Sequence, residues 1–388
     1  MIPRSLSDKV AEMLMKYPIV SLLGPRQAGK TTLAKMVRPD YQYVNLENLS
    51  IRSFALEDPV GFLATYQGGV IIDEAQYAPN LFSYLQVFTD ERNIKGEYIL
   101  TGSQNFLMME QITQSLAGRV AIFQLLPFSI DELDGTQYAE DKWEKYIIKG
   151  SYPRKLVDDI DAQTFYDNYL RTYIERDVRL VKNILDLGAF QRFIQLLAGR
   201  IGQQFNQNSL GVELGLNNKT INSWLSVLET SFIAFRLQPY FQNFNKRIVS
   251  TPKVYFYDLG LAAYLLGIRT EDELDTHYAK GSLFENLVIN ELQKNVMNKG
   301  QQPRFYFWRD QSQHEVDLLI QDGVNLKAIE IKSGKTIQKD FFKNLDFFGK
   351  VSGATDLNLI YGGDEFQKRT KVTAYPFHNL HNILLKNQ

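Results

Sequence analysis

The stretch that most restricts how this chain can fold is residues 24–31, GPRQAGKT, which matches the pattern G-x-x-x-x-G-K-[ST]. A mostly apolar run, PIVSLL (18–23), precedes it and predicts a buried strand, while KTTLAKMV (30–37) predicts a helix. In that setting the loop's backbone N–H groups can wrap a phosphate at a helix N-terminus. The residues that we expect to bind ATP are Gly24, Pro25, Arg26, Gln27, Ala28, Gly29, Lys30, Thr31 and Thr32.

Individual roles follow from the chemistry of a bound triphosphate. Lys30 would reach the β- and γ-phosphates, and Thr31 would hold Mg²⁺. A second apolar segment, GVIIDE (69–74), predicts a buried parallel strand that ends in two carboxylates. Asp73 can hold Mg²⁺ through water, while Glu74 can orient or deprotonate the attacking water. This pair disfavours a small-molecule kinase and predicts ATP hydrolysis.

A third apolar segment, EYILTGS (97–103), ends in polar residues that could sense the γ-phosphate. The chain contains no Asn-Lys-x-Asp guanine signature, so ATP is favoured over GTP. Together the three segments predict an ATP-binding and ATP-hydrolysing domain.

Four segments, GPRQAGKTTL, VIIDEAQ, ILTGSQNF and SLAGRVAIFQLLPFSIDEL, resemble the AAA+-type ATPases that are widespread in archaea and bacteria. In that family a nuclease-like domain of unknown function follows the ATPase. The resemblance implies a central parallel sheet in which the acidic strand and the polar-tipped strand flank the P-loop strand. It also implies that Ser103, or less favourably Asn105, is the residue that senses the γ-phosphate.

Arg119, in LAGRV, is a candidate for an arginine that completes the ATP site of a neighbouring subunit in a homo-oligomer. Arg176, in TYIERDV, is a second candidate. The alternative for either residue is an ordinary surface or ion-paired arginine.

The middle of the chain has helical periodicity, and we expect a helical lid over residues 136–185, with a break between helices at Gly150-Ser151-Tyr152-Pro153. Residues 209–240 then predict two helices around a turn at Gly215, followed by strands, as in a winged helix over residues 186–265. Such modules contact DNA or pack against protein. Polar or basic residues expected on the second helix and near the wing are Asn218, Lys219, Asn222, Ser223, Lys246, Arg247 and Lys253.

Near the C-terminus, residues 315–320 and 327–332 predict two strands around a turn that contains Asp-Gly. Glu330 and Lys332 lie two residues apart and therefore point to one face. With the strand FYFWR (305–309) and a helix over 281–294, the segment resembles the restriction-endonuclease-like fold and its D…E-x-K core. The resemblance implies that Asp317, Glu330 and Glu285 hold Mg²⁺ and that Lys332 positions the attacking water. His314 is interpreted as a turn residue.

The bare D…E-x-K pattern is weak, because it should occur by chance about once in a chain of this length. Two interpretations therefore stay open. In the first, ATP turnover is coupled to nucleic-acid binding or Mg²⁺-dependent cleavage, with DNA favoured over RNA. In the second, the C-terminal half is a catalytically inert partner-binding region of an ATP-dependent switch.

Composition bears on which partners and which cellular compartment these domains can have. With 43 basic and 44 acidic residues, net charge favours neither interpretation, and any nucleic-acid contact must come from local patches. The absence of cysteine excludes disulfides and suits a reducing cytoplasm. No run of eighteen apolar residues occurs, so we expect no membrane span.

The expected fold class is therefore α/β and multidomain. Its predicted parts are a P-loop ATPase domain over 1–135, the lid over 136–185, the winged helix over 186–265 and a restriction-endonuclease-like α/β domain over 266–388.

Overall fold

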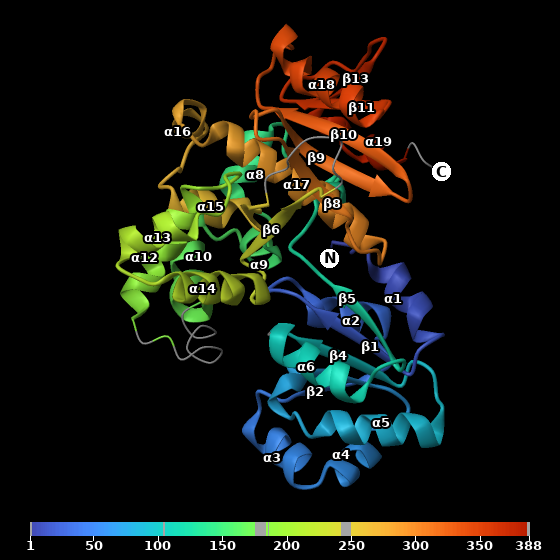
Figure 1. Cartoon of the computed structure of the whole chain (residues 1–388). Coiled ribbons are helices and arrows are strands. Elements are labelled where there is room, and N and C mark those ends of the chain that lie inside the picture. The colour runs from blue at the N-terminus through green and yellow to red at the C-terminus, as the bar shows by residue number, and fades with distance from the viewer. Residues whose placement is uncertain (1, 104, 175–183, 185, 242–249, 386–388) are drawn as a thin grey trace.

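The computed structural model describes residues 2–103, 105–174, 184, 186–241 and 250–385. Its N-terminal part is a five-stranded parallel sheet with helices on both faces (Figure 1). The strands are β1 (Ile19–Leu23), β2 (Gln42–Asn45), β3 (Val70–Asp73), β4 (Tyr98–Gly102) and β5 (Val120–Gln124). The accompanying helices are α1 (Ser7–Leu14), α2 (Lys30–Val37), α3 (Leu49–Glu57), α4 (Pro59–Thr65), α5 (Leu81–Arg92) and α6 (Asn105–Ser115).

Strand β1 is buried along its whole length, because both of its faces are covered. Val20 and Leu22 belong to the apolar cluster that includes Leu6 of the N-terminal segment and Leu33 of α2. Ile19 and Leu23 point the other way, into the main core of the molecule. The alternation of strand side chains thus divides the apolar run between two layers.

The strand order is β2-β3-β4-β1-β5, which corrects one expectation. The polar-tipped strand β4 does pair with the P-loop strand β1, but the other neighbour of β1 is β5. The acidic strand β3 pairs with β4 and β2 instead. Asp73 therefore reaches the P-loop across the end of β4 rather than from an adjacent strand.

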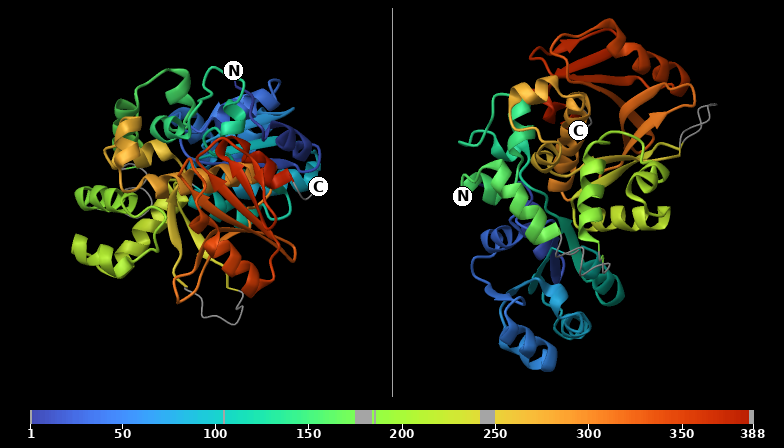
Figure 2. Two further views of the ribbon diagram at one scale, coloured as in Figure 1. Left: turned by 90° about the horizontal axis from the view of Figure 1, so that it is seen from above. Right: turned by 90° about the vertical axis from the view of Figure 1, so that its left-hand side faces the viewer.

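The middle of the chain is helical, and in the right-hand view of Figure 2 it lies between the N-terminal sheet and the C-terminal part. After the short helix α7 (Ile130–Leu133), the expected lid region holds α8 (Trp143–Lys149), α9 (Pro153–Val157), α10 (Ala162–Tyr169) and a π-helical turn (Leu170–Ile174). The helices that follow are α12 (Leu187–Ala198), α13 (Gln207–Leu214) and α14 (Asn218–Thr230). Gly215 ends α13 with φ +68°, a conformation that glycine adopts without strain.

An eight-stranded sheet occupies the C-terminal part, in the order β12-β13-β11-β10-β9-β8-β6-β7. Its strands are β6 (Ala234–Pro239), β7 (Lys253–Phe256), β8 (Phe305–Arg309), β9 (Glu315–Asp322), β10 (Asn325–Lys332), β11 (Asp356–Tyr361), β12 (Gln367–Lys368) and β13 (Val372–Pro376). The helices of this part are α15 (Leu259–Leu265), α16 (Glu271–Thr276), α17 (Lys280–Asn298), α18 (Lys343–Ser352) and α19 (His381–Leu385).

One sheet crosses the domain boundary that was expected at residue 265. Strands β6 and β7 form an antiparallel pair, as expected for a wing. However, β6 also pairs in parallel with β8, with Gln238 opposite Tyr306. The strands β6 and β7, which were expected to form a wing, therefore continue the sheet of the C-terminal strands.

Helix α17 connects the two halves of the molecule, and Figure 1 shows it below the C-terminal sheet. Its Lys294 Nζ donates a hydrogen bond of 2.8 Å to the carbonyl oxygen of Phe128, just after the N-terminal sheet. Its Glu291 accepts a 2.7 Å bond from the N–H of Ile130 in α7. Within the described part of the chain, none of the helices is both long and apolar enough to cross a membrane.

Candidate functional site

The P-loop leads from β1 into α2, and its backbone conformation explains its glycines. Gly24 has φ +151°, and a Cβ there would lie 2.1 Å from the carbonyl oxygen of Leu125. Gly29 has φ +90° and precedes the first residue of α2. The buried Lys30 Nζ donates to the carbonyl oxygens of Gly24 and Pro25, at 2.9 and 2.8 Å. The lysine is thus folded back against the loop that it would leave to reach a phosphate.

Asp73, the predicted magnesium residue, lies opposite the start of α2. Its Oδ2 accepts hydrogen bonds from Thr31 Oγ1 at 2.9 Å and from Tyr43 OH at 2.8 Å. Thr101 of β4 donates to its other oxygen. Burial, followed by the bond to Asp73, raises the pKa of Tyr43, so that tyrosine remains a donor. The structure therefore brings together the hydroxyl and the carboxylate that the sequence assigned to Mg²⁺.

Glu74 follows Asp73 in a left-handed conformation, with φ +54° and ψ +46°. A non-glycine residue in this region costs about 1–3 kcal/mol, and such strain is concentrated at functional sites. Glu74 Oε2 accepts a hydrogen bond of 3.1 Å from Ser103 Oγ and another from Gln76. The two predicted catalytic residues Glu74 and Ser103 therefore meet beside the P-loop. The side chain of Asn105 lies outside the described residues.

A cavity of about 630 Å³ opens over these residues. Its lining includes Arg26, Gln27, Gly29, Lys30, Thr31, Thr32, Asp73 and Glu74. Further lining residues come from outside the predicted motifs: Ile2, Arg4, Phe128, Pro153, Arg154, Val157 and Asp158. The segment around Pro153 was interpreted only as a break between helices. In the structure it starts α9 at the mouth of this cavity.

Arg4 is a second residue that the sequence analysis missed. Its buried guanidinium donates to the carbonyl oxygens of Ala28 and Leu126, both at 2.7 Å, and to Glu132 at 3.0 Å. Arg4 therefore ties the P-loop backbone to the exit of β5 and to α7. No local motif marks it, because its partners are more than twenty positions away in the sequence.

Arg119 lies at the opposite edge of the N-terminal sheet from its own P-loop, since its carbonyl oxygen pairs with the N–H of Ile19 at the start of β1. Its guanidinium makes two bonds to Asp90, of 2.6 and 2.7 Å. It cannot reach the ATP site of its own chain. Arg176 lies outside the described residues.

The C-terminal carboxylates meet where β9 and β10 run side by side. Asp317 Oδ2 accepts from the N–H of Ile331 at 2.8 Å and lies 3.3 Å from Lys332 Nζ. Lys332 Nζ also lies 2.6 Å from Glu330. Burial, followed by the negative charge of Asp317, raises the pKa of Glu330 to about 8. The D…E-x-K residues are thus adjacent, with the lysine between the two acids.

Glu285, the third predicted metal ligand, has different partners. It receives the ammonium of Lys253 at 2.9 Å and a bond from the hydroxyl of Tyr255. Among the described residues no group of three or more His, Asp or Glu side chains is arranged to hold a metal ion. The predicted ligand set Glu285, Asp317 and Glu330 is therefore not assembled as a cluster.

Two of these carboxylates still suit a divalent cation. Glu330 Oε2 is buried and, in the part of the chain that the structure describes, has no hydrogen-bond partner. Mg²⁺ is commonly held by one or two carboxylates together with water and phosphate oxygens. Asp317 and Glu330 match that donor set. His314 instead stacks on Phe347, with ring centroids 3.8 Å apart, as a side chain with a packing role.

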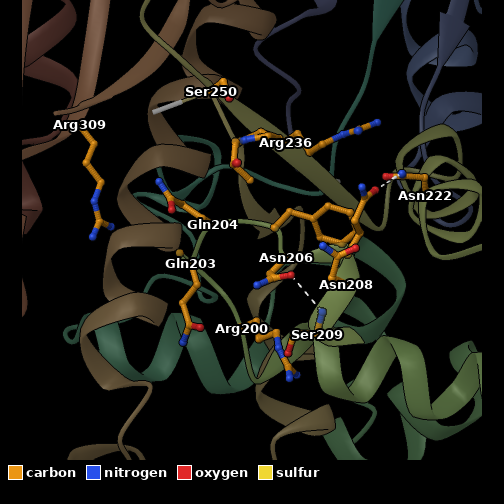
Figure 3. A pocket seen from close by; sticks show the side chains of 15 residues that line it. Arg200, Gln203, Gln204, Asn206, Asn208, Ser209, Asn222, Arg236, Ser250 and Arg309 are labelled. Atoms are coloured by element: carbon orange, nitrogen blue, oxygen red, sulfur yellow. Dashed lines mark hydrogen bonds between the residues drawn. The ribbon is translucent and has the colours of Figure 1, made fainter. Parts of the chain in front are cut away.

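A polar cavity of about 870 Å³ lies between α13, α14 and the edge of the C-terminal sheet (Figure 3). Arg200, Arg236 and Arg309 line it, together with the carboxamides of Gln203, Gln204, Asn206, Gln207, Asn208 and Asn222. Each of the three arginines is paired with a glutamate, namely Glu213, Glu229 and Glu315.

Of the three cations expected near the wing, Lys253 is buried and ion-paired, so it is not a surface contact for phosphate. This corrects its assignment, which failed because its two glutamate partners are distant in the sequence. Lys246 and Arg247 lie outside the described residues. The edge of this cavity is nonetheless close to the carboxylates, because Arg309 and Lys253 share Glu315.

Comparison with known proteins identifies the parts of the chain. A profile described as an AAA domain matches residues 16–134. Residues 140–272 and 280–380 match two domains of unknown function, DUF8612 and DUF4143. The uncharacterized protein Rv2008c of Mycobacterium tuberculosis is 30% identical over 336 residues, which cover 86% of this chain and 74% of the relative. The chain belongs to the Rv2008c family.

More distant members and solved structures are also similar. The uncharacterized protein MJ1544 of Methanocaldococcus jannaschii is 23% identical over 350 residues, covering 82% of this chain and 75% of the relative. A Walker-type ATPase of Pyrococcus abyssi, PABY2304, has 19% identity and a TM-score of 0.42, over 69% of this chain and 96% of that one.

The N-terminal part of this Rv2008c-family protein is an AAA-type P-loop ATPase domain, which binds and hydrolyses nucleotide. The AAA-domain match confirms the ATPase prediction. It does not bear on the nuclease-like and winged-helix predictions.

Proposed function

We propose that this protein couples ATP hydrolysis to the binding or cleavage of nucleic acid by its C-terminal part. The observation that carries the proposal is helix α17. Its Lys294 and Glu291 contact the segment that leaves the ATPase sheet, while Glu285, about two turns earlier, belongs to the carboxylate region. Nine residues of helix span about 14 Å. A structural change at the ATP site can therefore be transmitted through the rigid helix α17 to the C-terminal carboxylates.

At the ATP site, Lys30 would leave its loop carbonyls to pair with phosphate oxygens. Glu74, held by Ser103, is placed to orient a water molecule or take its proton. Mg²⁺, which neutralises phosphate charge when bound, would be held by Thr31 and Asp73. The helices around α9, which line one wall of the cavity, would serve as the lid.

In the C-terminal part, the order α17-β8-β9-β10-α18-β11 and the placement of Asp317, Glu330 and Lys332 support a restriction-endonuclease-like domain. Asp317 and Glu330 would hold Mg²⁺, which acts there as a Lewis acid toward a phosphodiester. Lys332 would position water or offset developing negative charge.

Nucleic acid is the proposed substrate class, with DNA favoured over RNA. Helices α13 and α14 with the β6–β7 pair support a winged-helix arrangement. The polar cavity beside them is lined mainly by arginines, carboxamides and hydroxyls. Surfaces that bind nucleic acid are polar, whereas the centre of a protein interface is usually apolar.

The test uses the purified full chain and a panel of single-stranded DNA, duplex DNA and RNA. Nucleic acid should raise the ATPase rate, and Mg²⁺ should permit cleavage. Lys30→Ala should abolish nucleotide binding or turnover, Glu74→Gln should bind ATP without hydrolysing it, and Glu330→Gln should lose cleavage alone. Lys16→Ala, at an exposed position of the N-terminal segment, is the control.

If no nucleic acid is bound or cut under any metal and nucleotide condition, the coupling proposal fails. The second candidate function is then an ATP-dependent switch whose inert C-terminal part binds a protein. The insertion of Lys332 between Asp317 and Glu330 favours that candidate, because the ammonium occupies the position where a cation is needed. In that case nucleic acid leaves the ATPase rate unchanged.

We further propose that Arg119 acts on the ATP site of a neighbouring subunit in a homo-oligomer. Its position at the edge of the sheet away from its own P-loop supports a role in trans. Arg119→Ala and Lys30→Ala chains, each inactive alone, should recover part of the ATPase rate when mixed. A mixture as inactive as its components contradicts the proposal.

A further inference from the structure

Lys253 has an unusual position for a lysine. It is the first residue of β7, and only 3% of its side chain is exposed. Its Nζ lies 2.9 Å from an oxygen of Glu285 in α17 and 2.6 Å from an oxygen of Glu315 in β9. The hydroxyl of Tyr255 donates to the same oxygen of Glu285. One ammonium thus joins two acids from two different elements.

The charge of this lysine is fixed by its surroundings. Its ammonium is shielded from solvent and lies within ion-pair distance of two carboxylates. Removing one member of such a buried set leaves an uncompensated charge, which typically costs about 3–5 kcal/mol. Lys253 therefore stays in place as a permanent positive charge.

Lys332 differs in this respect. It also bridges two acids, Asp317 and Glu330, but 34% of its side chain is exposed. A lysine with that exposure can swing its ammonium into solvent, where hydration replaces its ion pairs. An incoming cation therefore meets less resistance at Lys332 than at Lys253.

We propose that Lys253 is a resident cation of the C-terminal carboxylate site, where it keeps Glu285 from acting as a metal ligand and limits the site to a single divalent ion at Asp317 and Glu330. This inference rests on the proposed metal binding by that pair. The buried oxygen of Glu330 that has no partner in the described structure is the second observation that points to an ion there.

The assignment changes the expected roles of two residues. Glu285 becomes a positioning residue, which acts on the site by holding Lys253. Lys253 supplies a fixed positive charge beside Glu285 and Glu315, where a phosphate group of a bound substrate would need compensation. Because Lys253 belongs to β7, the last strand of the eight-stranded sheet, the β6–β7 pair contributes directly to the carboxylate site.

The experiment is a Mn²⁺ titration, followed by the electron paramagnetic resonance signal of the free ion. It uses the full chain without nucleotide and with Asp73→Asn to remove the N-terminal metal position. We expect a single Mn²⁺ per chain. Glu330→Gln should weaken its binding about tenfold or more, as for loss of a ligand, whereas Glu285→Gln should change it less than about twofold.

Variants of the lysine complete the test. Lys253→Met should admit a second Mn²⁺ between Glu285 and Glu315, whereas Lys253→Arg should still admit only one. Circular dichroism establishes whether Lys253→Met folds; if it does not, the Glu285→Gln result decides. The inference is overturned if Glu285→Gln weakens Mn²⁺ tenfold, if a folded Lys253→Met gains no ion, or if the parent binds none or two.

The metal readout is independent of cleavage. A chain that binds one Mn²⁺ as described but cuts no nucleic acid contradicts the proposed nuclease activity and supports the role of Lys253. Cleavage that survives with two bound ions contradicts the role of Lys253 and supports the nuclease.

Discussion

At the scale of single residues, Glu330 is a carboxylate whose surroundings oppose its usual negative charge. It is 2% exposed, and one of its oxygens lacks a partner among the described residues. Burial, with Asp317 nearby, raises its pKa to about 8, compared with about 4.3 for an unperturbed glutamate. The folded state therefore binds this proton more tightly than the unfolded state does.

That difference predicts how stability depends on pH. The favourable contribution of the protonated group is fully present below about pH 4 and is lost as the pH rises to about 8. Glu330→Gln should therefore flatten the fall in unfolding free energy between about pH 5 and 8. Urea denaturation in EDTA at several pH values measures this. Glu91→Gln, at an exposed site, should keep the parent slope, and an equal slope in Glu330→Gln contradicts the prediction.

Gly24 gives a second prediction at this scale. Gly24→Ala would place a Cβ against the carbonyl oxygen of Leu125, in addition to the strain of φ +151°. Gly118→Ala has only the strain, of about 1–3 kcal/mol, because nothing lies within 4 Å of its Cβ position. Gly24→Ala should therefore lower the unfolding free energy more than Gly118→Ala and remove ATP binding. Equal losses in both variants would show that the close approach is unimportant.

The sequence predicts residues well where spacing alone brings them together. The loop 24–31 and the pair Asp73–Glu74 could be assigned because a P-loop requires them in fixed order. Lys253 was misassigned as a surface cation, because its burial depends on Glu285 and Glu315, which are 32 and 62 positions further along. Arg4 was missed for the same reason, since its three partners come from the P-loop, the exit of β5 and α7.

At the scale of elements, α9 is the helix that the structure adds to the predicted ATP site. It is a short helix that begins at Pro153, and it contributes Arg154 and Val157 to the wall of the nucleotide cavity. Proline suits the first turn of a helix because its missing N–H needs no partner there. Pro153, where a break was predicted, is thus the residue at which α9 begins. The sequence did not indicate that α9 forms a wall of the nucleotide cavity.

Arg154→Gln should therefore raise the KM for ATP about threefold to tenfold, the range expected for one charged contact to phosphate. Its melting temperature should stay near that of the parent, because the side chain is 59% exposed. Arg171→Gln, on the π-helical turn after α10 and 68% exposed, is the matched control. An unchanged KM in Arg154→Gln, measured in a steady-state ATPase assay, would remove α9 from the nucleotide site.

Strand order is the element-scale feature that the sequence predicted least well. The three strands predicted at 18–23, 69–74 and 97–103 were assigned to a parallel sheet, but the position of β3 beyond β4 depends on which crossover each helix makes. Likewise, alternation in residues 234–239 indicates a strand without saying that one edge pairs with β7 and the other with β8. Which strands become neighbours depends on how the whole core packs, and local sequence patterns do not specify this.

At the scale of the whole molecule, the buried pair Glu291–Lys294 holds the two halves together. The ammonium lies 2.7 Å from Glu291 and also donates to Phe128 and Ser151. Both side chains are almost fully buried, although burial raises the pKa of Glu291 against the effect of its partner. The junction is therefore polar and specific.

Lys294→Met should lower the unfolding free energy by about 3–5 kcal/mol, because Glu291 would remain buried without its counter-charge. Adding Glu291→Gln should recover part of that loss, since the uncompensated charge is removed. Chemical denaturation of the parent, both single variants and the double variant measures the coupling. Additive losses, with no recovery in the double variant, would show that the two side chains do not act as a pair.

The pairing of β6 with β8 means that the C-terminal region is not a portable unit. A fragment that starts after residue 265 would leave the backbone N–H and C=O groups of β8 without the neighbour that covers them, and unpaired strand edges promote association between chains. Recombination or gene fission at that point would therefore yield an incomplete product that is prone to aggregation. The C-terminal half can therefore be inherited as a folded unit only together with the segment that precedes it.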